Sequence, residues 1–190
     1  MIDINLVDQA GVLSKADFNR LKTFVIDKCL CTSEELAKLE RVIVRDDGNS
    51  GYSGYWSGKY TRIGANVKDV TAVIVINSYY LKTVEQMERT LAHEFGHHWT
   101  LSYFMERQEM IGWFDEKAPW LYYRIRGLDP NKYAMDYSMG WGNCDKEVLA
   151  EDFKCRMSPY NGEHRMKNEI GNPTTEVADY IKALGKPYWL

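Results

Sequence analysis

The sequence predicts an α+β fold, in which a small mixed sheet packs on one long helix and the C-terminal part is mostly helical. Short β runs occur at residues 42–44 and 72–76, both in the first half of the chain. Apolar residues recur at helical spacing in longer segments, at residues 15–28, 84–101, 145–155 and 173–184. A chain of 190 residues fits a single domain, 1–190, or a domain to which residues 1–40 add a small helical unit.

The first half of the chain begins with helices and continues with strands. Ser14 is placed to cap the helix over 15–28, and Thr32 or Ser33 is placed to cap a short second helix. The β run at 42–44 ends in turn residues. The Gly- and Tyr-rich segment 50–66 predicts a twisted hairpin with aromatic packing. The alternative for this segment is an aromatic loop that lines one wall of a cleft.

The second half is organised around the helix that follows the strand at 72–76. Thr83 and Gln86 form a capping-box pattern, which predicts that this helix starts near residue 84 and runs to about residue 101. Residues 102–144 are predicted to be an irregular, aromatic connection. Asp145 is expected to cap the next helix, and Asn172 with Pro173 is expected to start the last one.

Composition and charge exclude several classes of protein. The net charge of -3 gives no basic surface for nucleic acid, and no apolar run approaches the ~20 residues of a membrane span. The N-terminal residues show no signal peptide. We therefore expect a protein that binds neither nucleic acid nor membrane. It would be cytoplasmic, or exported or released by a non-classical route.

The four cysteines do not form a metal-binding or catalytic pattern. Cys29 and Cys31 are too close for an ordinary disulfide between them, and the paired C-x-x-C elements of a zinc ribbon are missing. We expect four reduced, partly buried thiols. A bridge between Cys144 and Cys155 is the alternative.

The pattern that carries chemistry is His93-Glu94-Phe95-Gly96-His97, within the helix predicted over 84–101. Two His residues four positions apart lie on the same face of a helix, so both can bind one metal ion. Glu94 then lies beside the metal, where it can take a proton from a metal-bound water. The alternative is a His pair that is packed or exposed without a metal.

A second element, Glu147 and Glu151 on the helix predicted from residue 145, supplies two carboxylates one turn apart. One carboxylate can complete a set of three protein ligands, and the other can accept a proton from the far nitrogen of a ligand His. The alternative is a solvated, Glu-rich helix face. His164 is a rival third ligand, whereas His98 is expected to support the site or lie on the surface.

The motif at 93–97, followed by Glu147-Val148-Leu149-Ala150-Glu151-Asp152-Phe153, resembles the zinc peptidases of the anthrax lethal factor and Pro-Pro endopeptidase type. The likeness covers roughly residues 70–185. It implies a zincin-like metallopeptidase domain in which Glu147 binds zinc and Glu151 supports the ligands. It also implies a Tyr that stabilises the oxyanion, for which Tyr137 is the nearest candidate and Tyr133 the second.

These features together predict a zinc-dependent endopeptidase that acts on a protein or peptide substrate. His93, His97 and Glu147 would hold one Zn²⁺ per chain, and Glu94 would be the general base for attack on a peptide carbonyl. Two alternatives remain open. One is a non-catalytic, zinc-supported binding protein of phage or mobile-element type, and the other is a zinc amidase with a non-protein substrate.

Overall fold

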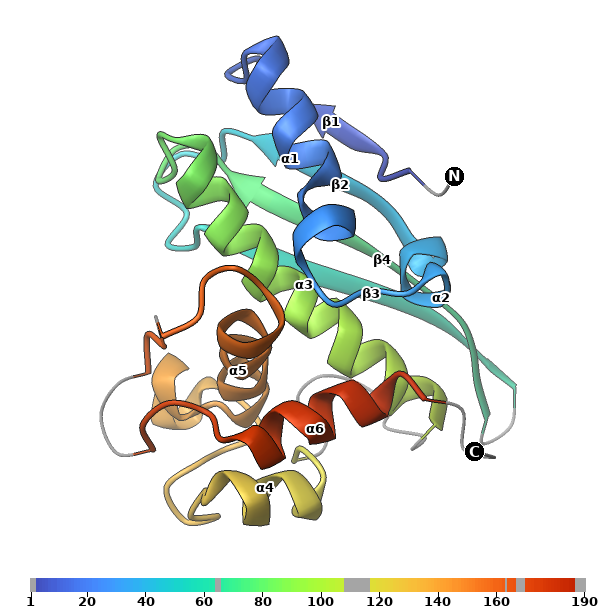
Figure 1. Ribbon diagram of the computed structural model, residues 1–190, viewed down its shortest axis with the longest axis vertical. Coiled ribbons are helices and arrows are strands. Elements are labelled where there is room, and N and C mark those ends of the chain that lie inside the picture. The colour runs from blue at the N-terminus through green and yellow to red at the C-terminus, as the bar shows by residue number, and fades with distance from the viewer. Residues whose placement is uncertain (1–2, 64–65, 108–116, 163, 167–169, 187–190) are drawn as a thin grey trace.

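A small mixed sheet and the long helix α3 form the centre of the structure (Figure 1). The computed structural model describes residues 3–63, 66–107, 117–162, 164–166 and 170–186. In chain order the elements are β1 (Leu6–Asp8), α1 (Lys15–Lys28), α2 (Ser33–Lys38), β2 (Leu39–Arg45), β3 (Gly54–Ile63), β4 (Asn66–Asn77), α3 (Val84–Arg107), α4 (Trp120–Arg126), the 3-10 helices η1 (Tyr137–Met139) and η2 (Trp141–Asn143), α5 (Asp145–Met157) and α6 (Thr175–Leu184). This architecture agrees with the predicted α+β class.

The sheet has the strand order β1-β2-β4-β3, and only β3 runs antiparallel to its neighbour. β3 and β4 form a long hairpin, whose connection at residues 64–65 lies outside the described part of the chain. The hairpin predicted within residues 50–66 is corrected, because that segment supplies one strand, β3, and the second strand is the one predicted at 72–76. The strand that precedes the His motif, β4, is an inner strand. β4 is therefore not available to a bound chain, because β3 occupies that edge of the sheet.

The predicted helix starts are confirmed where a polar side chain caps the helix. Ser14 accepts the backbone N–H of Asp17, and Thr32 caps α2 in a capping box with Glu35. Thr83 and Gln86 bond each other's backbone N–H groups at 3.2 Å, so α3 starts where the pattern predicts. α3 then continues to Arg107, beyond the predicted end near residue 101.

Three other sequence expectations are corrected by the structure. Residues 102–144 are not wholly irregular, because they hold the end of α3, all of α4 and two 3-10 helices; residues 108–116 lie outside the described part. Asp145 is the first residue of α5 and not its cap. Thr174, not Asn172, caps α6 by accepting the N–H of Val177.

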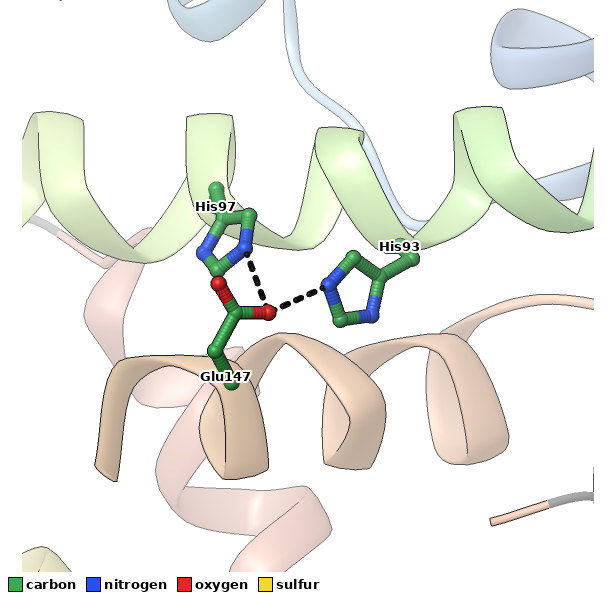
Figure 2. Close-up of side chains that lie close together, drawn as sticks. All are labelled: His93, His97 and Glu147. Carbon is green, nitrogen blue, oxygen red and sulfur yellow. Dashed lines mark hydrogen bonds and ion pairs between the residues drawn. The ribbon is translucent and has the colours of Figure 1, made fainter. Parts of the chain in front are cut away.

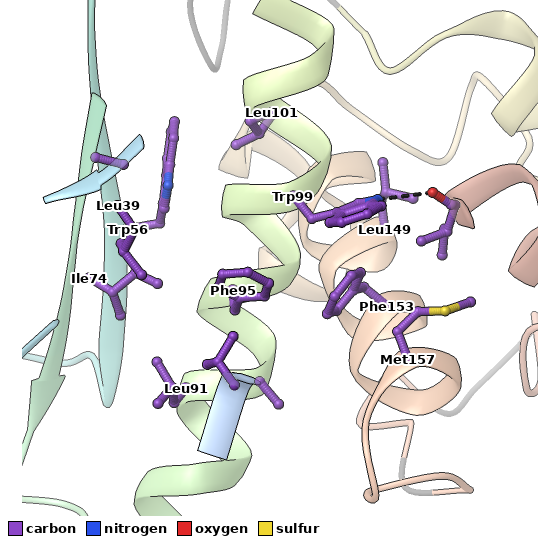
Figure 3. Close-up of a cluster of buried hydrophobic side chains, with 14 of the residues drawn as sticks. Leu39, Trp56, Ile74, Leu91, Phe95, Trp99, Leu101, Leu149, Phe153 and Met157 are labelled. Atoms are coloured by element: carbon purple, nitrogen blue, oxygen red, sulfur yellow. Dashed lines mark hydrogen bonds between the residues drawn. The ribbon is translucent and has the colours of Figure 1, made fainter. Parts of the chain in front are cut away.

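The core lies between the sheet and α3, and continues between α3 and α5 (Figure 3). On the sheet side, Trp56 and Ile74 face Leu91 and Phe95 of α3. On the opposite side α3 packs against α5, where the ring of Phe95 lies 6.0 Å from that of Phe153. α3 is therefore buried between two layers, which removes water from both of its packed faces.

α3 and α5 approach most closely at Gly96. A Cβ atom at this position would lie 2.8 Å from the carbonyl oxygen of Ala150 and 3.0 Å from the Cβ of Phe153. A glycine in a helix interior lowers stability by about 0.5–1 kcal/mol relative to alanine. At Gly96 this cost is offset by the close packing, which has no space for a Cβ atom. The contact brings the two helices close enough for their side chains to meet.

We expect Gly96→Ala to lower the free energy of unfolding by about 1–3 kcal/mol, because the new methyl group overlaps backbone atoms of α5 that cannot move independently. Gly142→Ala is the matched control, since a Cβ at Gly142 meets nothing within 4 Å. Thermal and urea unfolding of both variants would test this. Equal stability of the two variants would contradict the close helix contact.

Candidate metal centre

α3 and α5 bring two imidazoles and one carboxylate to a single point (Figure 2). His93 and His97 lie one turn apart on α3, with their ring centres 4.9 Å apart and their planes nearly perpendicular. Glu147 approaches from α5, and its Oε2 lies 2.9 Å from Nε2 of His93 and 3.4 Å from Nε2 of His97. All three side chains are buried.

This donor set fits a metal ion. Two imidazole nitrogens and one carboxylate oxygen form a common set of protein ligands for a transition metal with an open coordination position. Ligand atoms at about 2.0–2.1 Å from a tetrahedral ion are separated by roughly 3.4 Å, which is close to the separations between these nitrogen and oxygen atoms. The group can therefore bind a metal with little rearrangement.

Glu151 orients His93 from the side opposite Glu147. Its Oε2 lies 2.8 Å from Nδ1 of His93, so Nδ1–H donates to the carboxylate and Nε2 is left as the ligand atom. Glu151 is fully buried, and its other oxygen accepts from Lys154 and from the backbone N–H of Arg165. The alternative of a solvated, Glu-rich helix face is wrong, because both carboxylates are buried and hydrogen-bonded.

The charge of His93 depends on these carboxylates. Burial alone lowers the pKa of His93, but the hydrogen bonds with Glu147 and Glu151 outweigh burial and raise it to about 10. The same pairing lowers the pKa of Glu151 to about 2, against the opposing effect of burial. For His97 burial dominates, and its pKa is lowered. Without a metal, His93 is therefore protonated at neutral pH and His97 is not.

Glu94 is buried next to the metal-binding group but is not one of its three members. Burial is the main cause that raises the pKa of Glu94 to about 8, and the charge of His93 opposes it. The backbone N–H of Trp56, on β3, donates a hydrogen bond to Glu94. The carboxylate is thus held between α3 and the edge strand of the sheet.

Tyr137, the first candidate for an oxyanion-stabilising residue, reaches the site. Its hydroxyl donates to Oε1 of Glu147 at 2.7 Å, and burial together with Glu147 raises its pKa, so the hydroxyl keeps its proton. Tyr133, the second candidate, is buried away from the site, where its carbonyl accepts from Tyr123 at 3.5 Å. The structure therefore brings Tyr137 to the metal-binding group, but not Tyr133.

A cleft of about 1000 Å³ opens over the three metal-binding side chains. One wall is the segment from Gly51 through Gly58, which contains much of β3, together with Tyr60; the other wall includes Tyr137 and Trp141. The ring of Trp141 lies 5.9 Å from that of His93 and is 42% exposed. The Tyr-rich segment is thus one strand of a hairpin and also a cleft wall.

The remaining His residues have other partners. His98 is fully buried and not at the surface; it accepts from the indole N–H of Trp56 at 3.1 Å and donates to the carbonyl of Glu35 at 2.6 Å. His164, the rival third ligand, lies 2.9 Å from Asp152 and is not part of the metal-binding group. Both side chains therefore support the packing of helices.

The four cysteines are free thiols, so the alternative bridge between Cys144 and Cys155 is not formed. Sequence reasoning missed Trp141, Arg165 and the backbone of Trp56 as parts of the site. Periodicity gives no signal for them, because they lie on short 3-10 turns, a loop and a strand. Only the high aromatic content of residues 50–66 and 102–144 pointed toward two of these segments.

The chain matches no protein-family model, no curated protein and no solved structure. The resemblance to the lethal factor type of zinc peptidase thus rests on the motifs at residues 93–97 and 147–153 alone. Among the described residues, no helix combines the length and the apolar character that crossing a membrane requires.

We expect zinc-loaded wild type to contain one Zn²⁺ per chain and Glu147→Ala to lose most of it, because one of three ligands is removed. Glu151→Gln should keep the metal but bind it about 10-fold to 100-fold more weakly, since it only orients His93. His164→Ala is the control that keeps full occupancy. Elemental analysis after dialysis would measure this, and equal zinc in wild type and Glu147→Ala would remove Glu147 from the ligand set.

Metal binding should release between one and two protons near neutral pH, one from His93 and up to one from Glu94, whose pKa of about 8 leaves it largely protonated without metal. His93, with a pKa of about 10, is protonated without metal and must lose that proton to bind, whereas His97 is already neutral. The apparent affinity should therefore fall about 10-fold to 100-fold for each pH unit between pH 8 and 6.5. Calorimetry in buffers of different ionisation enthalpy would count the protons. An affinity independent of pH would contradict the charged state of His93.

Proposed function

We propose that the chain is a zinc-dependent endopeptidase with a zincin-like metal site. The proposal rests above all on one arrangement: a buried His93, His97 and Glu147 group with the carboxylate of Glu94 beside it, under an open cleft. The same donor set also suits Fe²⁺ in oxygenases. A buried carboxylate next to the metal group supports hydrolysis instead, because water activation requires a base there.

The cleft favours an extended substrate. Residues 54–60 of β3, along one wall, span roughly 20 Å at about 3.3 Å per residue, which is room for several residues of a peptide. β3 is the edge strand of the sheet, so outer backbone groups other than the N–H of Trp56, which bonds Glu94, can pair with a bound chain. These features support a peptide substrate over a small amide, and cleavage within a chain over removal of single end residues.

Each residue of the group has a proposed role. His93, His97 and Glu147 would hold zinc, which would supply Lewis-acid activation of the attacking water. Glu94 takes the proton of the attacking water and passes it to the leaving amine. Tyr137 donates a hydrogen bond to the carbonyl oxygen as negative charge develops there. Glu151 fixes the ring of His93 and does not contact substrate.

The decisive variant is Glu94→Gln. It preserves the shape of the side chain but removes the base, so we expect peptide cleavage to fall by about 10²–10⁴-fold while zinc content stays at one per chain. Glu85→Gln, on the exposed face of α3 where Glu85 pairs with Arg89, is the matched control and should cleave like wild type.

The assay is incubation of the zinc-loaded protein with a proteome-derived peptide library, followed by mass spectrometry of new termini. Wild type that holds zinc but cleaves no peptide would argue against the endopeptidase and favour the binding protein or the amidase. Cleavage that persists in Glu94→Gln would show that another group acts as the base.

A further inference from the structure

Arg165 lies at the edge of the metal site without a role in the chemistry proposed above. Its backbone N–H donates to Oε1 of Glu151 at 2.9 Å, and the other oxygen of Glu151 bonds His93. The carboxylate of Glu151 thus links the backbone of Arg165 to the imidazole of His93. The side chain is exposed and lines the cleft.

The guanidinium of Arg165 forms no close pair with a described carboxylate. Its guanidinium makes no hydrogen bond or ion pair with any residue that the structure describes. Among the described residues that line the cleft it is the single Lys or Arg, and the acids there are Glu94 and Glu147. Both carboxylates already have partners in the site, because Glu147 bonds His93 and Tyr137, and Glu94 bonds Trp56.

The position of Arg165 separates it from the carbonyl that would be cleaved. Tyr137 approaches the metal-binding group through Glu147, whereas Arg165 approaches through Glu151, on the Nδ1 side of His93. Arg165 nevertheless lines the same cleft as His93, Glu94 and Glu147, so its guanidinium opens into the space above the reacting groups. A substrate group beside the scissile bond would therefore be within its reach.

We propose that Arg165 is a specificity-determining residue that binds a substrate carboxylate next to the scissile bond. This inference rests on the proposed peptidase function. A guanidinium presents paired N–H donors that match the two oxygens of a carboxylate, and such bidentate pairs are strong and geometrically selective. Because the guanidinium makes no ion pair with the residues that the structure describes, it can bind such a group without first breaking a bond to one of them.

The test uses peptidyl hydroxamates, which chelate an open zinc site and need no catalysis to be detected. Each of the three probes carries the hydroxamate at its N-terminal end. Two have an amidated C-terminus and differ only in having Asp or Asn next to the hydroxamate; the third is neutral at that position and ends in a free carboxylate. Their dissociation constants for the zinc-loaded protein are measured by calorimetry. The acidic side chain and the free terminus are the two sources of the carboxylate, and the probes separate them.

In wild type we expect one of the two carboxylate-bearing probes, the Asp probe or the probe with a free terminus, to bind about 10-fold to 100-fold more tightly than the Asn probe. Arg165→Gln should reduce that ratio to within about threefold, and Arg165→Lys should leave an intermediate ratio, because a single ammonium lacks the paired donors. Lys59→Gln removes the same charge from β3 outside the cleft lining and should leave the ratio unchanged.

The outcomes are distinguishable. If all probes bind wild type with equal affinity, or if the preference survives in Arg165→Gln, the role of Arg165 is wrong while the zinc site stands. If no hydroxamate binds to zinc-loaded wild type, the open metal site itself is wrong, and the role of Arg165 fails with it. If the Asp probe binds most tightly, the group that Arg165 binds is an acidic side chain of the substrate. If the probe with the free terminus binds most tightly, that group is the C-terminal carboxylate of the substrate.

Discussion

Two carboxylates of α5 are buried against one imidazole of α3, and a buried charge is stable only when it is paired. Glu147 and Glu151 lie one turn apart and contact the two opposite nitrogens of His93. Sliding α5 along α3 by one turn would leave one of these carboxylates buried without a partner, at a cost of several kcal/mol. Electrostatic pairing therefore fixes the relative position of the two helices, and the missing side chain at Gly96 permits the close approach that this pairing needs.

A second layer of polar contacts holds this pair in place. α5 is buried along nearly its whole length, so its polar residues also find partners outside α3. Asp152 accepts from Tyr122, Arg126 and His164, and Arg126 also bonds the carbonyl groups that precede α6. These bonds tie the segment after α5 to the site, which positions the backbone N–H that reaches Glu151. Pre-organised ligands of this kind lose little freedom when a metal binds.

Local signals predicted the parts of the fold that local interactions determine. Capping residues such as Ser14 and Thr83 marked helix starts correctly, and the spacing of His93 and His97 required only that α3 be a helix. Strand order and the extra helix α4 depend on pairing between distant segments, which periodicity does not record. Tyr137 illustrates the limit. It lies ten residues before Glu147, and its hydroxyl contacts that carboxylate because two successive 3-10 helices compact the intervening chain.

The environment of Glu94, the proposed base, depends on a strand that lies outside the motif at residues 93–97. Spacing puts Glu94 beside the metal group, but the direction of its carboxylate is determined by β3, through the backbone N–H of Trp56. β3 can come this close because Gly54 has no Cβ; such an atom would lie 3.2 Å from Oε1 of Glu94 and 2.6 Å from Cγ2 of Thr90. The same strand is the sheet edge beside the cleft. A peptide paired with β3 would therefore be positioned by the strand that also contacts Glu94. The same strand would set both the position of the scissile bond and the position of the base.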